Sequence, residues 1–171
     1  EAMTMSDRIA VMMDGEILQC AAPDVIYEDP DDIRVAEFIG SPKINILPVE
    51  RNGTELTVFD QVLTSRFSVD SPKVIQFGLR PEALQLSQSA PLLTGRVVHF
   101  ENLGSEAFAQ VALDSNGSRV TLRAMPAQRQ SLGLGKQVGL TFDLRAAIMF
   151  DAEGNRLRRA ELAATLAPEV A

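Results

Sequence analysis

The chain has 171 residues, of which 46% are hydrophobic and 23% charged, enough to bury a core in one domain or slightly more. Its 16 basic and 23 acidic residues give a net charge of −7, which disfavours binding to nucleic acids. A single cysteine excludes an internal disulfide and fits a reducing cytoplasm. No apolar stretch reaches the roughly 18 residues of a membrane-spanning helix. We therefore expect a soluble chain that meets a membrane only through a partner.

The first segment predicts a β-hairpin. Residues 9–13 read Ile-Ala-Val-Met-Met, an apolar run typical of a strand inside a covered sheet. Asp14-Gly15 is a two-residue hairpin turn, and residues 16–20 form the returning strand. Because no initiator methionine and no covering element precede the run, we expect the chain to be a piece of a longer protein. The hairpin must then pack on later residues, pair with a second copy or stay exposed, and we expect a homodimer, with exchange of hairpins as one form of it.

Two short helices follow the hairpin. Pro23 opens the first, since a proline in the first helical turn loses no hydrogen bond. Asp31 or Asp32 is placed to cap the second, which runs through Phe38 and stops at Gly40.

From residue 43 onward the pattern changes from helix to short strands separated by turns. The predicted strands are residues 45–49, 55–59, 73–80, 95–101, 107–113, 119–123 and 137–144. The predicted turns are Asn52-Gly53, Asn116-Gly117 and Glu153-Gly154-Asn155. Strands of this length and spacing favour a small OB-like barrel, so we expect a mainly β fold behind the hairpin and helices. The tail, residues 156–166, has leucines among charges and predicts a terminal helix.

Several of these segments resemble the ATP-binding subunits of bacterial carbohydrate ABC importers of the maltose and glycerol-phosphate type. In that family a segment like residues 1–8 follows the switch histidine of the nucleotide-binding domain. Residues 38–42, with Asn45 just after, resemble the junction with the regulatory domain. Gly-Leu-Arg-Pro-Glu at residues 78–82 and Glu-Asn-Leu-Gly-Ser-Glu at residues 101–106 resemble two signatures of that domain, called TOBE. The resemblance spans nearly the whole chain.

The resemblance implies two parts and no catalysis. Residues 1–40 would be the C-terminal remnant of an ABC nucleotide-binding domain, and residues 41–171 a TOBE or OB-like regulatory domain. The phosphate-binding loop, the ABC signature, the catalytic carboxylate and the switch histidine are missing. Gly135-Lys136 does not replace the loop, because Gln130 and Gln137 stand where that motif needs a glycine and a hydroxyl residue. We expect no enzyme activity, cofactor or metal in this chain, ATP and Mg²⁺ belonging to its parent.

The resemblance further implies a regulatory and dimerisation module of an importer at the cytoplasmic side of the inner membrane. Its partners would be a second copy, membrane permease subunits and, in some members, a regulatory protein. The candidate regulatory or dimer-contact residues are Ser41, Pro42, Asn45, Arg80, Pro81, Glu82, Glu101, Leu103, Gly104 and Glu106.

Arg80-Pro81-Glu82 has a physical interpretation of its own. Pro81 restricts Arg80 to an extended conformation, so the strand ends on a charged side chain held in one direction. Two interpretations stay open: a surface strand end with an ion pair worth under ~1 kcal/mol, or a contact site. The second signature is equally open, because Asn102 and Gly104 also suit a bulge or turn.

Two functions from other classes remain as alternatives. An OB fold that binds oligonucleotides needs a basic groove with stacking aromatics, but the chain has no tryptophan and one tyrosine. An oxyanion or small-ligand sensor of an ABC transporter could use Arg119, Arg123 and Arg129, although no clustered hydroxyls accompany them.

Isolated reactive residues favour structural roles. His99 has no second ligand beside it, and Cys20 lacks a histidine partner and is expected to be a small buried residue. The acidic residues 28–32 lack the spacing of a calcium loop and predict caps and solvated charge.

Overall fold

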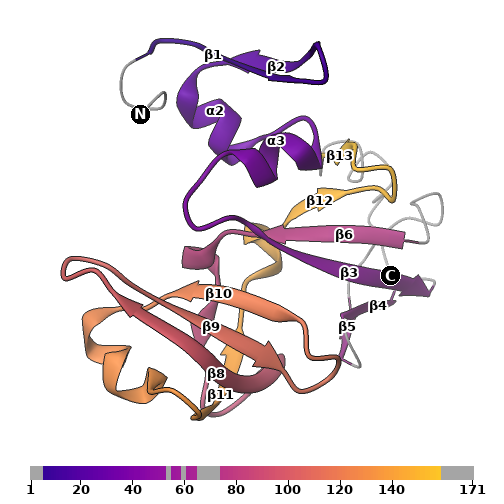
Figure 1. The fold of residues 1–171 in the computed structure, drawn as a ribbon. Helices are drawn as coiled ribbons and strands as arrows, with labels where there is room; N and C mark the ends of the chain where they lie inside the picture. The colour runs from indigo at the N-terminus through magenta and orange to yellow at the C-terminus, as the bar shows by residue number, and fades with distance from the viewer. Residues whose placement is uncertain (1–5, 53–54, 59–60, 65–73, 159–171) are drawn as a thin grey trace, which may run out of the picture.

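The structure, a computed structural model, describes residues 6–52, 55–58, 61–64 and 74–158. The predicted mainly β fold is confirmed. Within these ranges the strands form three antiparallel sheets, and the two short helices lie between the N-terminal hairpin and the large sheets (Figure 1). No helix in the described ranges is both long enough and apolar enough to span a bilayer.

The N-terminal part follows the predicted order. Its elements are β1 (Ile9–Met13), β2 (Glu16–Ala21), α2 (Pro23–Glu28) and α3 (Ile33–Phe38). Asp14 and Gly15 form the turn with φ of 51° and 85°, the positive values that a tight hairpin requires. The Asp32 carboxylate caps α3, accepting a hydrogen bond from the Arg34 backbone N–H at 2.8 Å.

The hairpin packs on its own helices, an arrangement that the sequence did not predict. One face of β1 joins the helices in a small apolar cluster that comprises Ile9, Val11, Ile26, Val35 and Ile39. The opposite face carries Met12 and Ile17, which are 58% and 60% exposed. The apolar run is therefore covered on one face only.

Two larger sheets make up the rest. The six-stranded sheet runs in the order β13 (Arg156–Leu157), β12 (Ile148–Phe150), β6 (Val74–Leu79), β3 (Asn45–Asn52), β4 (Glu55–Val58) and β5 (Gln61–Thr64). The five-stranded sheet runs in the order β10 (Arg119–Arg123), β9 (Ala107–Leu113), β8 (Leu93–Asn102), β11 (Gln137–Thr141) and β7 (Gln85–Leu86). Short 3₁₀ turns are η1 (Pro81–Ala83), η2 (Pro126–Leu132) and η3 (Leu144–Ala146).

The main core lies between these two sheets, and β6 is buried on both faces. Phe77 and Leu79 point into the main core with residues of β8, β9 and β11. A side chain on Gly78 would point the other way, where a Cβ atom would lie 2.8 Å from Ile44 Cδ1 and 3.1 Å from Phe150 Cε2. A second apolar layer therefore covers this other face of β6, beneath α3. Because both faces are covered, apolar and polar residues do not alternate along the strand.

The seven predicted strands are all present with boundaries shifted by a few residues. Four short strands were missed: β5, β7, β12 and β13. The terminal helix predicted for residues 156–166 is wrong at its start, because Arg156 and Leu157 pair with Phe150 and Met149 as β13. Its remainder after residue 158, like Gly53 of the first predicted turn, lies outside the described residues.

Candidate functional site: the joint between the N-terminal helices and the barrel

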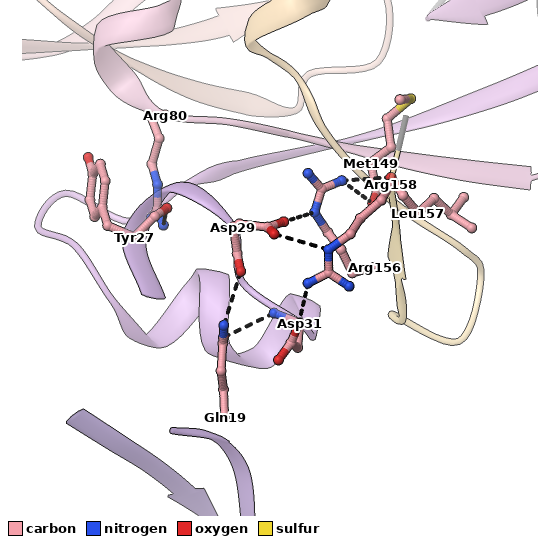
Figure 2. Close-up of polar contacts among 9 residues, drawn as sticks. All are labelled: Gln19, Tyr27, Asp29, Asp31, Arg80, Met149, Arg156, Leu157 and Arg158. Carbon is pink, nitrogen blue, oxygen red and sulfur yellow. Dashed lines mark hydrogen bonds and ion pairs between the residues drawn. The ribbon is translucent and has the colours of Figure 1, made fainter. Parts of the chain in front are cut away.

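Arg80 is the residue on which the N-terminal helices and the β-sheets meet. It follows β6 directly, with φ −61° and ψ 150°, the extended conformation that the next residue, Pro81, imposes. Its side chain turns away from solvent toward the helices and is only 6% exposed (Figure 2). The backbone thus holds the Arg80 side chain in one direction, as the sequence predicted. That direction is toward the interior, so Arg80 is not a surface strand end.

The Arg80 guanidinium binds backbone oxygens of both helices. Nη1 donates to the carbonyl oxygens of Ala36 and Ile39 at 3.0 and 2.6 Å, and Nη2 donates to that of Tyr27 at 2.9 Å. Ala36 and Ile39 lie at the C-terminal end of α3, where carbonyls lack helical partners and the helix dipole is negative. A side chain at the end of β6 thus caps α3. We call this cluster the Arg80 anchor.

The Tyr27 ring lies 4.0 Å from the Arg80 guanidinium carbon, a cation–π distance. The phenol donates a 2.7 Å hydrogen bond to Glu82 Oε1. Burial, this hydrogen bond and the charge of Glu82 raise the pKa of Tyr27 to about 12. Burial also lowers the pKa of Arg80, which stays a cation because arginine loses its proton only at extreme pH.

Gly40 supplies the space that the guanidinium occupies. Its φ is 110°, a conformation that residues with a side chain rarely adopt. A Cβ atom there would also lie 3.1 Å from Arg80 Nη1 and 3.4 Å from the Tyr27 ring. The glycine predicted to stop α3 is therefore also required by the anchor. Next to it, Ser41 is exposed, Pro42 is half-buried, and the peptide bond between them is cis.

A second cluster joins the same two parts through charge, and we call it the arginine pair. Asp29 accepts from Arg156 Nε and Arg158 Nε, both at 3.0 Å, and Arg158 also pairs with Asp31 (Figure 2). Burial acts to raise the pKa of Asp29, but the hydrogen bond from Arg158 and the charges of both arginines outweigh it and hold the pKa below its ordinary value. The acidic residues are thus more than caps and solvated charge.

Gln19 extends this cluster to the hairpin. Its amide donates to the Asp29 carbonyl oxygen and accepts from the Asp31 backbone N–H, both at 3.0 Å. The sequence did carry a signal for the arginine pair. Asp29 and Asp31 are two residues apart, as are Arg156 and Arg158, so the spacing of the two acidic residues matches that of the two basic ones.

Asn45, the candidate at the start of β3, joins the two large sheets. The side-chain amide donates to the carbonyl oxygens of Leu79 and Thr121 at 3.0 and 2.8 Å, and its oxygen accepts from the Thr121 N–H at 2.6 Å. The residue is 7% exposed, so these bonds are made out of water.

The second signature forms the exposed turn between β8 and β9. Leu103 is 59% exposed, and Gly104 has φ 85°. The turn is held from η2 by Arg129, which donates to the Gly104 carbonyl oxygen at 2.9 Å. Glu106 pairs with Arg123 at 2.7 Å, with both side chains about half exposed. Glu101 is exposed one residue before the end of β8.

The two signatures approach each other through Arg123. Arg123 is the last residue of β10, and β10 packs against η1, which contains Glu82. The positive charge of Arg123 acts to lower the pKa of Tyr27, whereas the negative charge of Glu82 acts to raise it. Arg80 and Asn45 lie inside this region, whereas Glu82, Leu103 and Glu106 lie toward solvent.

The arginines considered for an oxyanion site are dispersed. Arg123 and Arg129 have the partners given above, and Arg119 lies at the opposite end of β10 from Arg123. Cys20 is exposed, so its predicted burial is wrong, and His99 is exposed as well. Within the described residues, no three His, Cys, Asp or Glu side chains gather as a metal site would require.

In this site the buried Arg80 side chain connects the β-sheets to the ends of the two N-terminal helices. Comparison with known proteins shows which family the chain resembles. Residues 77–150 match the family model described as the TOBE domain. The lactose transport ATP-binding protein LacK of Rhizobium radiobacter is 31% identical over 170 residues, which cover 92% of this chain and 46% of LacK. The sn-glycerol-3-phosphate import ATP-binding protein UgpC of Cereibacter sphaeroides is 36% identical, covering 91% of this chain and 44% of UgpC.

An iron importer subunit matches too. The Fe(3+) ions import ATP-binding protein FbpC 2 of Rhodococcus jostii is 32% identical over 88% of this chain and 43% of its own length. The cytoplasmic molybdate-binding protein ModG has a TM-score of 0.42 and 12% identity, covering 61% of this chain and 94% of ModG, a likeness too distant to indicate a ligand. Residues 77–150 thus form a TOBE domain, and most of the chain is similar to the ATP-binding subunits of ABC importers. The chain spans less than half the length of these relatives.

Proposed function

We propose that the chain is the non-catalytic regulatory and dimerisation part of the ATP-binding subunit of a carbohydrate or glycerol-phosphate importer. The similarity to LacK and UgpC supports this transport class. The sequence lacks a phosphate-binding loop, so we assign no ATP hydrolysis to residues 1–171. ATP and Mg²⁺ would serve the nucleotide-binding part of the whole subunit, which would sit on permease subunits at the cytoplasmic side of the inner membrane.

The observation that carries the proposal is the Arg80 anchor. A regulatory domain can act on a neighbouring domain only if the joint between them transmits movement. Here the buried Arg80 guanidinium donates hydrogen bonds of 2.6 to 3.0 Å to backbone carbonyl oxygens at the C-terminal ends of the two preceding helices. A displacement of the TOBE domain would therefore carry α2 and α3 with it.

In this mechanism two copies pair through their TOBE domains, and an effector that prefers one arrangement of the pair shifts the balance between them. Arg80 and Asn45 would act from inside, as positioning residues. The solvent-facing candidates Glu82, Leu103 and Glu106 would form the contact surface. Ser41, Pro42, Pro81, Glu101 and Gly104 would set the course of the chain around it.

Light scattering of the chain over a concentration series tests the pairing. We expect a dimer that Leu103→Asp weakens at least tenfold, because a charge would replace an exposed apolar side chain. Leu134→Asp is the matched control, since Leu134 is 74% exposed on the separate turn after η2. A paired Met12→Asp/Ile17→Asp variant tests the alternative contact through the hairpin.

A chain that stays monomeric, or a dimer that only the hairpin variant disrupts, would contradict pairing through the TOBE domain. In the whole transporter, Leu103→Asp should reduce the regulation of transport. The ATPase rate of the isolated variant subunit should stay near that of the unsubstituted subunit. Unchanged regulation would contradict the proposed role of this turn.

A further inference from the structure

A pocket of about 340 Å³ lies at the end of the five-stranded sheet farthest from β10, and no contact described above uses it. It lies between β8, β11, the segment after β7 and the end of η2. Its polar lining consists of Ser87, Gln88, Thr94, Ser131 and Gln137. Pro91 adds an apolar ring, and Leu86, Val138 and Gly139 complete the lining.

The strand register places the pocket on the outer face of this sheet. Thr94 pairs directly with Gly139, and Gln137 pairs with Arg96, so all four residues share a face. This face is the exposed one, because the alternate residues Val138 and Leu140 are buried. The pocket is therefore reachable by a dissolved molecule without opening of the core.

Gly139 allows the segment after β7 to form one wall. A Cβ atom at this position would lie 2.5 Å from the Ser87 carbonyl oxygen and 2.7 Å from Pro91 Cβ. The Ser87 backbone N–H donates to the Gly139 carbonyl oxygen at 2.9 Å, which holds the wall against β11. A larger residue at position 139 would push this wall outward.

The polar groups are neutral and partly oriented. Ser87 Oγ accepts from the Ala90 N–H at 3.3 Å, which leaves its hydroxyl hydrogen to donate elsewhere. Gln137 Nε2 donates to the Asp114 carboxylate at the rim, which fixes the amide and directs its oxygen as an acceptor. Arg96, also on this face, donates to the Gly135 carbonyl oxygen at 2.9 Å. No lining residue carries a charge.

We propose that this pocket binds a neutral polyhydroxylated small molecule, such as a sugar or polyol. The hydroxyl and amide groups of the lining can exchange hydrogen bonds with the hydroxyl groups of such a molecule, and the Pro91 ring offers aliphatic surface to its C–H faces. The volume is at the lower end of the roughly 300–1,000 Å³ of ligand sites, enough for one or two sugar rings. The lining itself offers an anion no cation, because Arg96 on this face donates to the Gly135 carbonyl oxygen, and the Asp114 carboxylate lies at the rim. Because no aromatic ring lines the pocket, we expect affinities on the order of millimolar.

Two-dimensional ¹⁵N–¹H NMR titration of the chain with lactose and with glycerol tests the proposal, with sodium phosphate and sodium molybdate as anionic probes. We expect lactose to shift the backbone amide resonances of residues 87–90, 92–94, 131 and 137–139. Thr94→Val and Ser131→Ala should each weaken binding about threefold to tenfold, since each removes one hydrogen-bonding hydroxyl without adding charge. Ser118→Ala, in the turn between β9 and β10, is the control and should leave binding unchanged.

Shifts confined to the pocket and weakened by both variants would support the site. The proposal would be overturned by an absence of shifts at ~50 mM lactose and glycerol, well above the millimolar range expected, by shifts outside the pocket, or by stronger binding of phosphate or molybdate there. Binding is measured on this chain alone, so its failure would leave the dimer and transport tests of the proposed function untouched.

Discussion

The two clusters that join the N-terminal helices to the sheets use the same side chain in opposite surroundings. The Arg80 anchor holds one guanidinium, 6% exposed, against neutral backbone oxygens and a tyrosine ring. The arginine pair holds two guanidinium groups against carboxylates, and although the Arg156 side chain is 13% exposed, those of Arg158 and Asp29 remain 40% and 42% exposed. In the anchor, breaking a contact leaves buried groups unsatisfied. In the arginine pair, water can hydrate Asp29 and Arg158 when their contact breaks, and dissolved salt screens their charges. The Arg80 anchor should therefore contribute most to the stability of this joint. The arginine pair should contribute less, by an amount that depends on salt and pH.

The largest effect should come from the anchor itself. Arg80→Met removes three hydrogen bonds and leaves the carbonyl oxygens of Tyr27, Ala36 and Ile39 unsatisfied, so we expect a loss of about 3 kcal/mol in the free energy of unfolding. Urea denaturation measures it, and Arg80→Lys, which keeps the charge, should lose about half as much. Arg145→Met, at an 84% exposed side chain, is the control and should change stability by less than ~0.5 kcal/mol. Equal effects at both positions would remove the distinction between buried and exposed arginines.

The space beside the anchor should come second. Gly40→Ala adds a methyl group 3.1 Å from Arg80 Nη1 at φ 110°, so we expect a loss of about 2 kcal/mol. Gly117→Ala, at φ 71° with open space around the Cβ position, separates the backbone effect from the clash. If the two variants lose equal stability, the loss at Gly40 comes from its positive φ and not from the contact with Arg80.

Removing charge from the arginine pair should have a smaller effect that depends on salt and pH. Asp29→Asn should lower the free energy of unfolding by about 1 kcal/mol at low salt and by less at high salt. Because the folded pKa of Asp29 lies below its unfolded value, its contribution is full above about pH 4 and is lost as pH falls through the folded pKa. Acid denaturation of both proteins tests this, and the Asn variant should lack that component. A difference that persists at acidic pH and high salt would contradict an electrostatic origin.

The smallest effect should come from the rim of the anchor. Tyr27→Phe keeps the ring under Arg80 and loses only the hydrogen bond to Glu82, so we expect a loss under ~1 kcal/mol at neutral pH. The raised folded pKa means that this contribution is present below about pH 10 and is lost as pH rises toward about 12. Since the chain has one tyrosine and no tryptophan, the absorbance of tyrosinate reports on this residue directly. Glu82→Gln should lower the pKa of Tyr27, and an unchanged pKa would contradict the assigned cause.

Local features of the fold could be read from the sequence, because each depends on a few neighbouring residues. The Asp14-Gly15 turn, the Asp32 cap and the break at Gly40 are of this kind. The missed strands β7, β12 and β13 have two or three residues, and such short segments become strands only through the neighbours they pair with.

The joint could be predicted only in part. The sequence singled out Arg80 and Asn45, but their partners are 34 to 76 residues away in the chain. A charged residue at a strand end also suggests the surface, and burial of Arg80 depends on carbonyl groups that only the folded helices direct toward it. The contact roles of Glu82, Leu103 and Glu106, and the division of the chain at residue 40, stay predictions.

Asn45 has a consequence for the order in which the chain completes its structure during synthesis. It is made early, yet its amide is satisfied only when Thr121 has left the ribosome. The helices before it wait still longer, since their partners include Arg156 and Arg158. Although they are translated before both large sheets, these helices are thus among the last of the described elements to become fixed.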